Sequence, residues 1–136
     1  MRDYRRNHKQ NYDSPIKAIQ ICTDIQNHII SIKYFTVRKG ISKQHVKNLQ
    51  NEIIILGGDV YALLRKTELE SNDSNKIHLL ENTKIRVLYW INLLNRAADI
   101  GAIKGKTGMH LANQMHDLDD AIKKWIKYIK QKQNNK

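Results

Sequence analysis

The sequence has a single cysteine, Cys22, one proline and six glycines among its 136 residues. One cysteine excludes an internal disulfide and a zinc site built from several cysteine ligands. So little proline and glycine excludes collagen-like chains and Pro/Gly-rich disordered chains. Apolar residues make up 40% of the sequence, which indicates a folded chain, and this length is typical of one domain.

Long hydrophobic runs are also missing. No apolar stretch approaches the ~18 residues that a membrane-spanning helix needs. The N-terminus is polar, with Arg2, Asp3, Arg5 and Arg6, and no apolar segment follows, so no signal peptide is recognisable. We therefore expect a soluble protein located in the cytoplasm.

Positive charge is what the sequence has in excess. Lys and Arg number 24 against 13 Asp and Glu, which gives a formal net charge of +11. Such a field attracts polyanions, of which nucleic acid is the usual one, because binding releases counterions. The alternative is that the charge only keeps the protein soluble. Charge alone does not distinguish RNA from DNA.

Four amphipathic segments account for most of the chain. In each of them apolar residues recur at steps of three and four, which is the period of one helix face. No alternation typical of strands and no hairpin turn is present. Good capping residues stand at the start of the first, second and fourth segments, and the predicted helices are Ser14–Thr36, Ser42–Thr67, Ser74–Ile100 and Thr107–Gln131.

These segments predict an all-α fold, an up-down-up-down antiparallel four-helix bundle over residues 13–131. A basic flexible tail, residues 1–12, precedes it, and a frayed basic tail, residues 132–136, follows. Alternating helix directions gather basic residues at both ends of the bundle. One end receives Arg2, Arg5, Arg6, Lys9, Arg65, Lys66, Lys76, Lys127, Lys130 and Lys132, and the other receives Lys33, Arg38, Lys39, Lys43, Arg96, Lys104 and Lys106.

Individual core positions follow from the same periodicity. The stripe of the second segment ends on Val60 and Leu63, and that of the third ends on Leu94 and Ala98, with one interruption at Lys84. Gly57 and Gly58 interrupt the second segment and predict either a kink or the close approach of another backbone. Cys22 is predicted to be a small buried hydrophobic residue, and Trp90 and Trp125 are predicted to be core or interface anchors.

Motifs for nucleotide or metal binding fail on spacing. The segment Gly101–Thr107 has three residues between its glycines where a phosphate loop has four, and a helix precedes it where that motif needs a strand. It predicts a helix–helix turn in which Lys104 and Lys106 are able to hold one phosphate. His110 and His116 are six residues apart and do not share a helix face. We therefore expect no catalytic residue, no metal ligand and no cofactor.

The aspartates of the last segment have a simpler explanation than metal binding. Asp119 and Asp120 lie four residues before Lys123 and Lys124, which is the favourable order for ion pairs within a helix. Enzymatic activity, such as metal-dependent RNA cleavage by Asp117, Asp119 and Asp120, is an alternative that the absence of a credible carboxylate or metal cluster disfavours.

A lysine stripe is the strongest candidate binding feature. Lys123, Lys127 and Lys130 fall within about 60° of one another around the last helix, beside its apolar seam. Such a stripe can follow a phosphate backbone. The alternative is a solvated flank whose alkyl chains cover the core. In both cases the three side chains are expected to be exposed and to tolerate substitution without unfolding the protein.

The second half of the chain resembles a known family. Its features are Ile85-Arg-Val-Leu-Tyr-Trp-Ile-Asn-Leu-Leu94, a basic glycine-containing turn, and a helix that opens at Thr107 and closes on Trp125-Ile126 and lysines. Over residues 77–131 this pattern resembles Avd, the accessory variability determinant of diversity-generating retroelements. Avd belongs with the four-helix proteins that include those encoded in intervening sequences of bacterial ribosomal RNA genes.

The resemblance implies a non-enzymatic accessory subunit that assembles as a basic, barrel-like pentamer. It also implies binding to a reverse transcriptase and to template RNA, with DNA as a further nucleic-acid partner, during mutagenic cDNA synthesis. The matching basic positions are Arg86, Arg96, Lys123, Lys124, Lys127 and Lys130. The bundle ends add Arg65, Lys66, Arg38 and Lys39 as candidate nucleic-acid or polymerase contacts, and Leu88, Tyr89 and Leu93 are the candidate subunit interface. The alternative is an intervening-sequence-type protein that binds nucleic acid without a reverse transcriptase.

Overall fold

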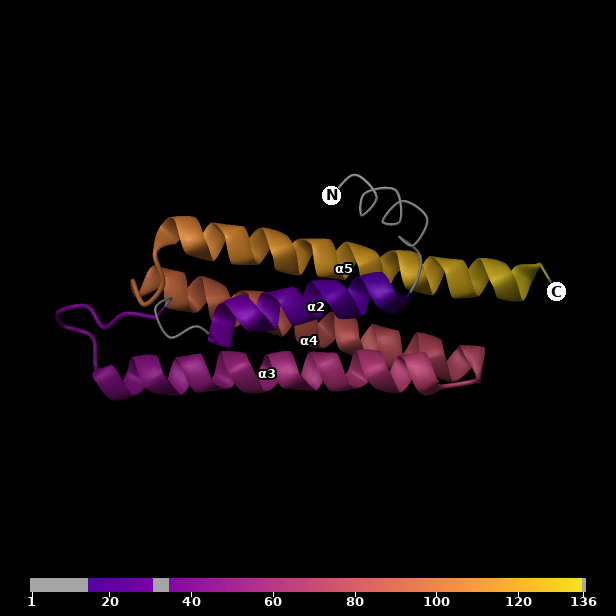
Figure 1. The fold of residues 1–136 in the computed structure, drawn as a ribbon, viewed down its shortest axis with the longest axis horizontal. Coiled ribbons are helices and arrows are strands. Elements are labelled where there is room, and N and C mark those ends of the chain that lie inside the picture. The colour runs from indigo at the N-terminus through magenta and orange to yellow at the C-terminus, as the bar shows by residue number, and fades with distance from the viewer. Residues whose placement is uncertain (1–14, 31–34, 136) are drawn as a thin grey trace.

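The computed structural model describes residues 15–30 and 35–135, and these form four helices without any strand. The helices lie side by side along one long axis, and successive helices run in opposite directions (Figure 1). Their bounds are Pro15–Ile30 for α2, Lys43–Leu69 for α3, Asp73–Asp99 for α4 and Gly105–Asn134 for α5. The prediction of an all-α four-helix bundle is confirmed.

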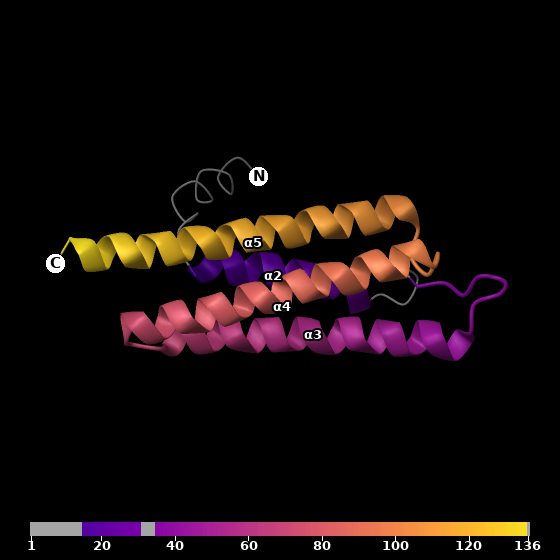
Figure 2. The same ribbon diagram turned by 180° about the vertical axis from the view of Figure 1, so that it is seen from behind.

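Each helix packs against two others. α2 and α4 both contact α3 and α5, and Figure 2 shows α4 lying between α3 and α5. The apolar faces meet in one core, whose largest fully buried side chains include Trp90, Leu94 and Met115. All six apolar positions predicted for the last helix are buried, namely Leu111, Met115, Leu118, Ile122, Trp125 and Ile129.

The first helix is shorter than predicted. α2 ends at Ile30, whereas the apolar pattern predicted a helix to Thr36. Thr36 is not helical because its backbone N–H donates to the carbonyl of Ala102, 2.7 Å away, in the loop between α4 and α5. That long-range hydrogen bond replaces the helical one. Residues 1–14 and 31–34, and with them the predicted cap Ser14, lie outside the described residues.

Helix starts agree with the predictions in part. Ser42 caps α3, as predicted, by accepting a hydrogen bond from the His45 amide at 3.3 Å. α5 begins at Gly105, so the predicted cap Thr107 lies inside the first turn, and no side chain caps this helix. At its other end α5 includes residues 132–134, three residues beyond the predicted end.

Two core positions differ by one residue from the prediction. Leu64 is fully buried and Leu63 is half-buried, and likewise Ala97 is buried and Ala98 is half-buried. The predicted stripes followed steps near 3.5 residues, whereas a straight helix has 3.6 residues per turn, so the buried face shifts along a long helix. Where Lys84 interrupts the predicted apolar stripe, the neighbouring residue Thr83 is buried instead. The Thr83 hydroxyl donates to the Leu79 carbonyl at 2.7 Å.

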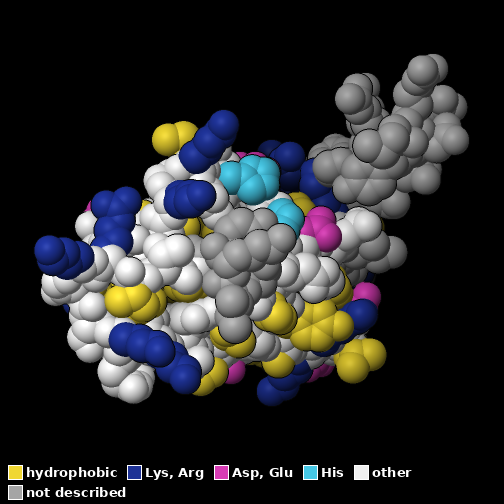
Figure 3. Space-filling model, turned by 60° about the vertical axis from the view of Figure 1, so that its left-hand side comes forward, with side chains coloured by type: hydrophobic (Ala, Val, Ile, Leu, Met, Phe, Trp, Pro, Cys, Tyr) yellow, Lys and Arg dark blue, Asp and Glu magenta, His cyan; other side chains and the backbone are white. Residues whose placement is uncertain are grey.

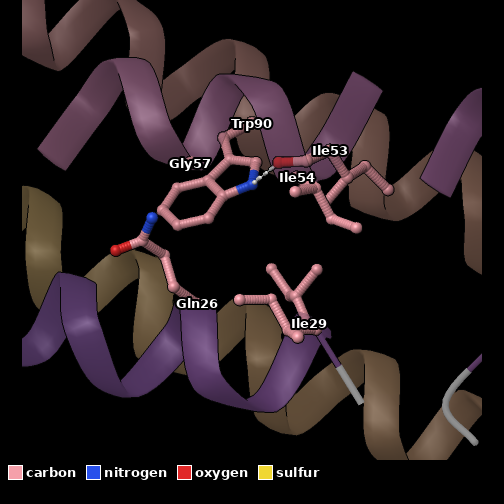
Figure 4. A pocket seen from close by; sticks show the side chains of 7 residues that line it. Gln26, Ile29, Ile53, Ile54, Gly57 and Trp90 are labelled. Carbon is pink, nitrogen blue, oxygen red and sulfur yellow. Dashed lines mark hydrogen bonds between the residues drawn. The ribbon is translucent and has the colours of Figure 1, made fainter. Parts of the chain in front are cut away.

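The glycine pair in α3 has two different environments. The helix continues through both residues. A Cβ added to Gly57 would lie 2.8 Å from Cζ2 of Trp90, so the close approach predicted here is made by an indole and not by a backbone. Nothing lies within 4 Å of the corresponding position on Gly58. The Trp90 side chain is fully buried, and its N–H donates to the Ile53 carbonyl at 3.0 Å (Figure 4).

Among the described residues, no helix combines the length and the apolar character needed to cross a membrane.

Candidate nucleic-acid interface

All three lysines of the predicted stripe line a groove between α4 and α5. These helices pack side by side in opposite directions (Figure 2), which places the first half of α4 next to the last half of α5. Four of the residues that line the groove are lysines. The lining residues, which we call the lysine groove, are Glu81, Lys84, Lys123, Ile126, Lys127, Lys130, Gln131 and Asn134.

Lys84 is the groove residue that sequence reasoning missed. In the sequence Lys84 interrupts the apolar stripe of its helix, and this interruption is the signal that sets it apart. The structure shows that the Lys84 side chain is 29% exposed and lies on the side of α4 that faces α5. Its nearest acidic group is Glu81, at 4.0 Å, which is the limit for an ion pair. Such exposed pairs are weak, so Lys84 can still contact a ligand.

Lys123 differs from the other lysines of the groove because it is paired. Its Nζ lies 2.8 Å from the Asp119 carboxylate, which confirms the first of the two ion pairs predicted in this helix. The Asp119 residue is only 7% exposed, and its Oδ1 atom has no hydrogen-bond partner among the described residues. The hydrogen bond that Lys123 donates to Asp119, followed by the negative charge of Asp119, raises the pKa of Lys123.

Replacing Lys123 with glutamine should therefore lower the melting temperature by several degrees, whereas Lys127→Gln should leave it almost unchanged. The first change leaves a buried carboxylate without its cation, which is destabilising. The ion pair therefore distinguishes Lys123 from the other two stripe lysines, although we still expect the Lys123 variant to fold.

The pH dependence of melting provides the check. Because folding raises the Lys123 pKa above the usual 10.5, the contribution of the pair is complete below that pH and declines as the pH rises through the folded value. The difference between wild type and Lys123→Gln should accordingly be constant from neutral pH to about pH 9 and shrink above about pH 10.5. Equal melting of the Lys123 and Lys127 variants would contradict a structural role for the pair.

The remaining basic candidates on α4 and α5 do not join the groove. Lys124 lies on the other side of α5, in a groove against α2 that also contains Asp24, Asp117 and Asp120. Arg86 is exposed and lies about 200° around α4 from Lys84, and Arg96 is exposed and about 120° away. The positions that the resemblance grouped together therefore occupy several faces.

At the end of the bundle where α3 meets α4, Lys66 is exposed and Arg65 is held in place. The Arg65 guanidinium donates to the Tyr61 hydroxyl at 3.0 Å and to Glu68 at 2.9 Å. These hydrogen bonds raise the pKa of Arg65, and the one to Tyr61 has the larger effect. The basic residues predicted in the N-terminal tail lie outside the described residues.

The opposite end is basic but dispersed. Figure 3 shows this end with its Lys and Arg side chains spread over the surface instead of gathered in one patch. Lys39 is exposed. Gly101 has a φ of +77° and ends α4, with the amide of Ala102 donating to the Ala97 carbonyl, as in a Schellman motif. The Arg38 side chain crosses this glycine, since an added Cβ would lie 2.6 Å from its Cδ. Lys33 lies outside the described residues.

The candidate interface residues divide between the surface and the core. Leu88 is 53% exposed and Tyr89 is 55% exposed, whereas Leu93 is buried in the core of its own bundle. Ile85, at 64% exposed, joins the exposed pair on the outer face of α4. The sequence pattern did not separate these positions because Leu93 is buried only through the contact of α4 with the neighbouring helices.

Other reactive groups are built into the bundle. Cys22 is fully buried, as predicted, and burial raises the pKa of its thiol to about 12, so it is not present as a reactive thiolate near neutral pH. His28 shares a hydrogen bond of 3.0 Å with Gln114, and its ring lies 5.7 Å from that of His110. No group of three or more metal-ligating side chains is found in the described part of the chain.

On the described surface the lysine groove brings four lysines from two helices together, and the other basic candidates lie outside it. Comparisons with protein-family models, with curated proteins and with solved structures found no match for this chain.

Proposed function

We propose that the protein is a non-enzymatic accessory subunit of a diversity-generating retroelement. In this role it is a basic oligomeric scaffold that binds the reverse transcriptase and the template RNA during mutagenic cDNA synthesis. The observation that carries the nucleic-acid part is the lysine groove, in which Lys84, Lys127 and Lys130 converge from two helices. The retroelement part rests on the resemblance of residues 77–131 to Avd.

Charge supports the proposal beyond the groove. The net charge of +11 attracts RNA over long range. The groove is a site where several cations can act on one ligand. A polyanion that displaces counterions from such a site binds more weakly as salt rises. The protein is expected to bind RNA in this salt-sensitive way.

Self-association is supported by the outer face of α4. Ile85, Leu88 and Tyr89 are three large apolar side chains, all more than half exposed and close together on one helix. Neighbouring exposed apolar side chains of this kind commonly mark a protein interface. We propose that this face joins the subunits of a ring-like oligomer, with five subunits as the Avd resemblance implies.

Light scattering of the purified protein, with and without structured RNA and at two salt concentrations, tests the proposal. We expect a particle with the mass of a pentamer that binds RNA more weakly at the higher salt. A tagged form should also retain the reverse transcriptase of the same retroelement when both are co-expressed. An unrelated polymerase is the matched control for non-specific charge attraction.

The possible failures have different meanings. A monomer with no RNA affinity at low salt contradicts the whole proposal. A monomer or dimer that binds RNA but retains no reverse transcriptase contradicts the retroelement role and favours the intervening-sequence type of four-helix protein.

A further inference from the structure

We infer that the lysine groove binds the sugar–phosphate backbone of double-helical RNA, and that Lys84, Lys127 and Lys130 make the phosphate contacts. This inference rests on the proposed function, which names RNA, and it specifies the form of RNA and the residues that bind it. The composition of the groove, the pairing of its lysines and the absence of a stacking surface support it.

The available cations lie on both walls of the groove. Lys127 and Lys130 come from α5, and neither has an ion pair within the described residues. They are separated by about 4.5 Å along the helix axis, and long flexible side chains at that spacing can reach successive phosphates of one strand. Lys84 faces them from α4, with only the distant Glu81 as partner. A ligand between the walls therefore meets positive charge on two sides.

Lys123 lines the groove but contributes little to it. The buried Asp119 carboxylate holds its ammonium at 2.8 Å and offsets its charge. An RNA phosphate that recruited Lys123 would leave Asp119 buried and unpaired, which is costly. The structure thus separates Lys123, which pairs with Asp119, from Lys127 and Lys130 of the same stripe, and it adds Lys84 to them as a third ligand-binding residue.

The lining of the groove favours a duplex over a single strand. Proteins that bind single strands usually stack the bases on aromatic rings. The groove contains no aromatic side chain, and its one apolar residue, Ile126, is buried in the floor. Double-helical RNA keeps its bases stacked inside and is recognised through phosphates and 2′-hydroxyls. The side-chain amides of Gln131 and Asn134 can donate to and accept from such hydroxyls at the end of the groove.

Fluorescence anisotropy with two labelled RNAs tests this inference. One is a duplex of about 16 base pairs and the other is an unstructured single strand of about 16 nucleotides. Each is measured at about 50 and 200 mM salt. We expect wild type to bind the duplex more tightly. The double variant Lys127→Gln/Lys130→Gln should bind the duplex about tenfold more weakly at the lower salt, with a salt slope reduced by about one per lysine. Adding Lys84→Gln should weaken binding again.

The matched control is Lys43→Gln/Lys47→Gln, which removes the same charge from exposed positions on α3. It should reduce duplex affinity much less than the groove variant, and melting curves should show that both variants are folded. Equal losses in the two variants would overturn the assignment to the groove. Tighter binding of the single strand by wild type would overturn the duplex assignment and leave the proposed function standing. Absence of any RNA binding by wild type would contradict the proposed function itself.

Discussion

Gly57→Ala should destabilise the bundle by about 1–3 kcal/mol, as expected for an extra methylene in a packed core, although alanine is the better helix former. An added Cβ would lie 2.8 Å from Cζ2 of Trp90, which is inside van der Waals contact. The indole cannot move away easily, because it is fully buried and its N–H is bonded to the Ile53 carbonyl. The steric cost therefore exceeds the gain in helix propensity of about 1 kcal/mol.

Gly58→Ala is the matched control and should have the opposite sign. The two glycines are adjacent in the same helix, but nothing lies within 4 Å of a Cβ at Gly58. Only the propensity term remains, so this variant should be stabilised by up to about 1 kcal/mol. Urea unfolding followed by circular dichroism at one protein concentration measures both. Stabilisation by Gly57→Ala would show that the indole has room to shift.

Trp90→Ala should cost about 3–5 kcal/mol, since it removes the largest fully buried side chain and leaves a cavity. Trp90→Phe should cost less, about 1–3 kcal/mol, because most of the ring is retained while the hydrogen bond to the Ile53 carbonyl is lost. Helical circular dichroism during urea unfolding measures both variants.

A double-mutant cycle makes the contact between these residues measurable. The phenyl ring is smaller than the indole and has no atom at the position of Cζ2, the indole atom closest to the added Cβ. Gly57→Ala should therefore cost less in the Trp90→Phe background than in wild type, with a coupling of at least about 0.5 kcal/mol. Additive effects would mean that the cost of Gly57→Ala does not come from contact with the indole.

The helices and their inner faces could be predicted from the sequence because they depend on local spacing. Apolar side chains at steps of three and four specify one helix face whatever lies opposite. This determined the four helices, the burial of Cys22 and Trp125, and the position of Lys123, Lys127 and Lys130 on one side of α5. Short connections between long helices also determined their antiparallel order, since neighbours in sequence pack together.

The pairing of faces between helices was decided by the tertiary structure, because it depends on which residues lie opposite one another. Lys84 joined the lysine groove through the contact of α4 with α5. Gly57 leaves room for the indole of Trp90, which comes from α4. The backbone N–H of Thr36 donates to the Ala102 carbonyl in the α4–α5 loop, and Thr36 is not helical. Spacing alone predicted the ion pair of Asp119 with Lys123. The packing of the helices buries the Asp119 carboxylate, and this burial makes Lys123 a structural residue. Lys127 and Lys130, the other lysines of the stripe, have no such partner among the described residues.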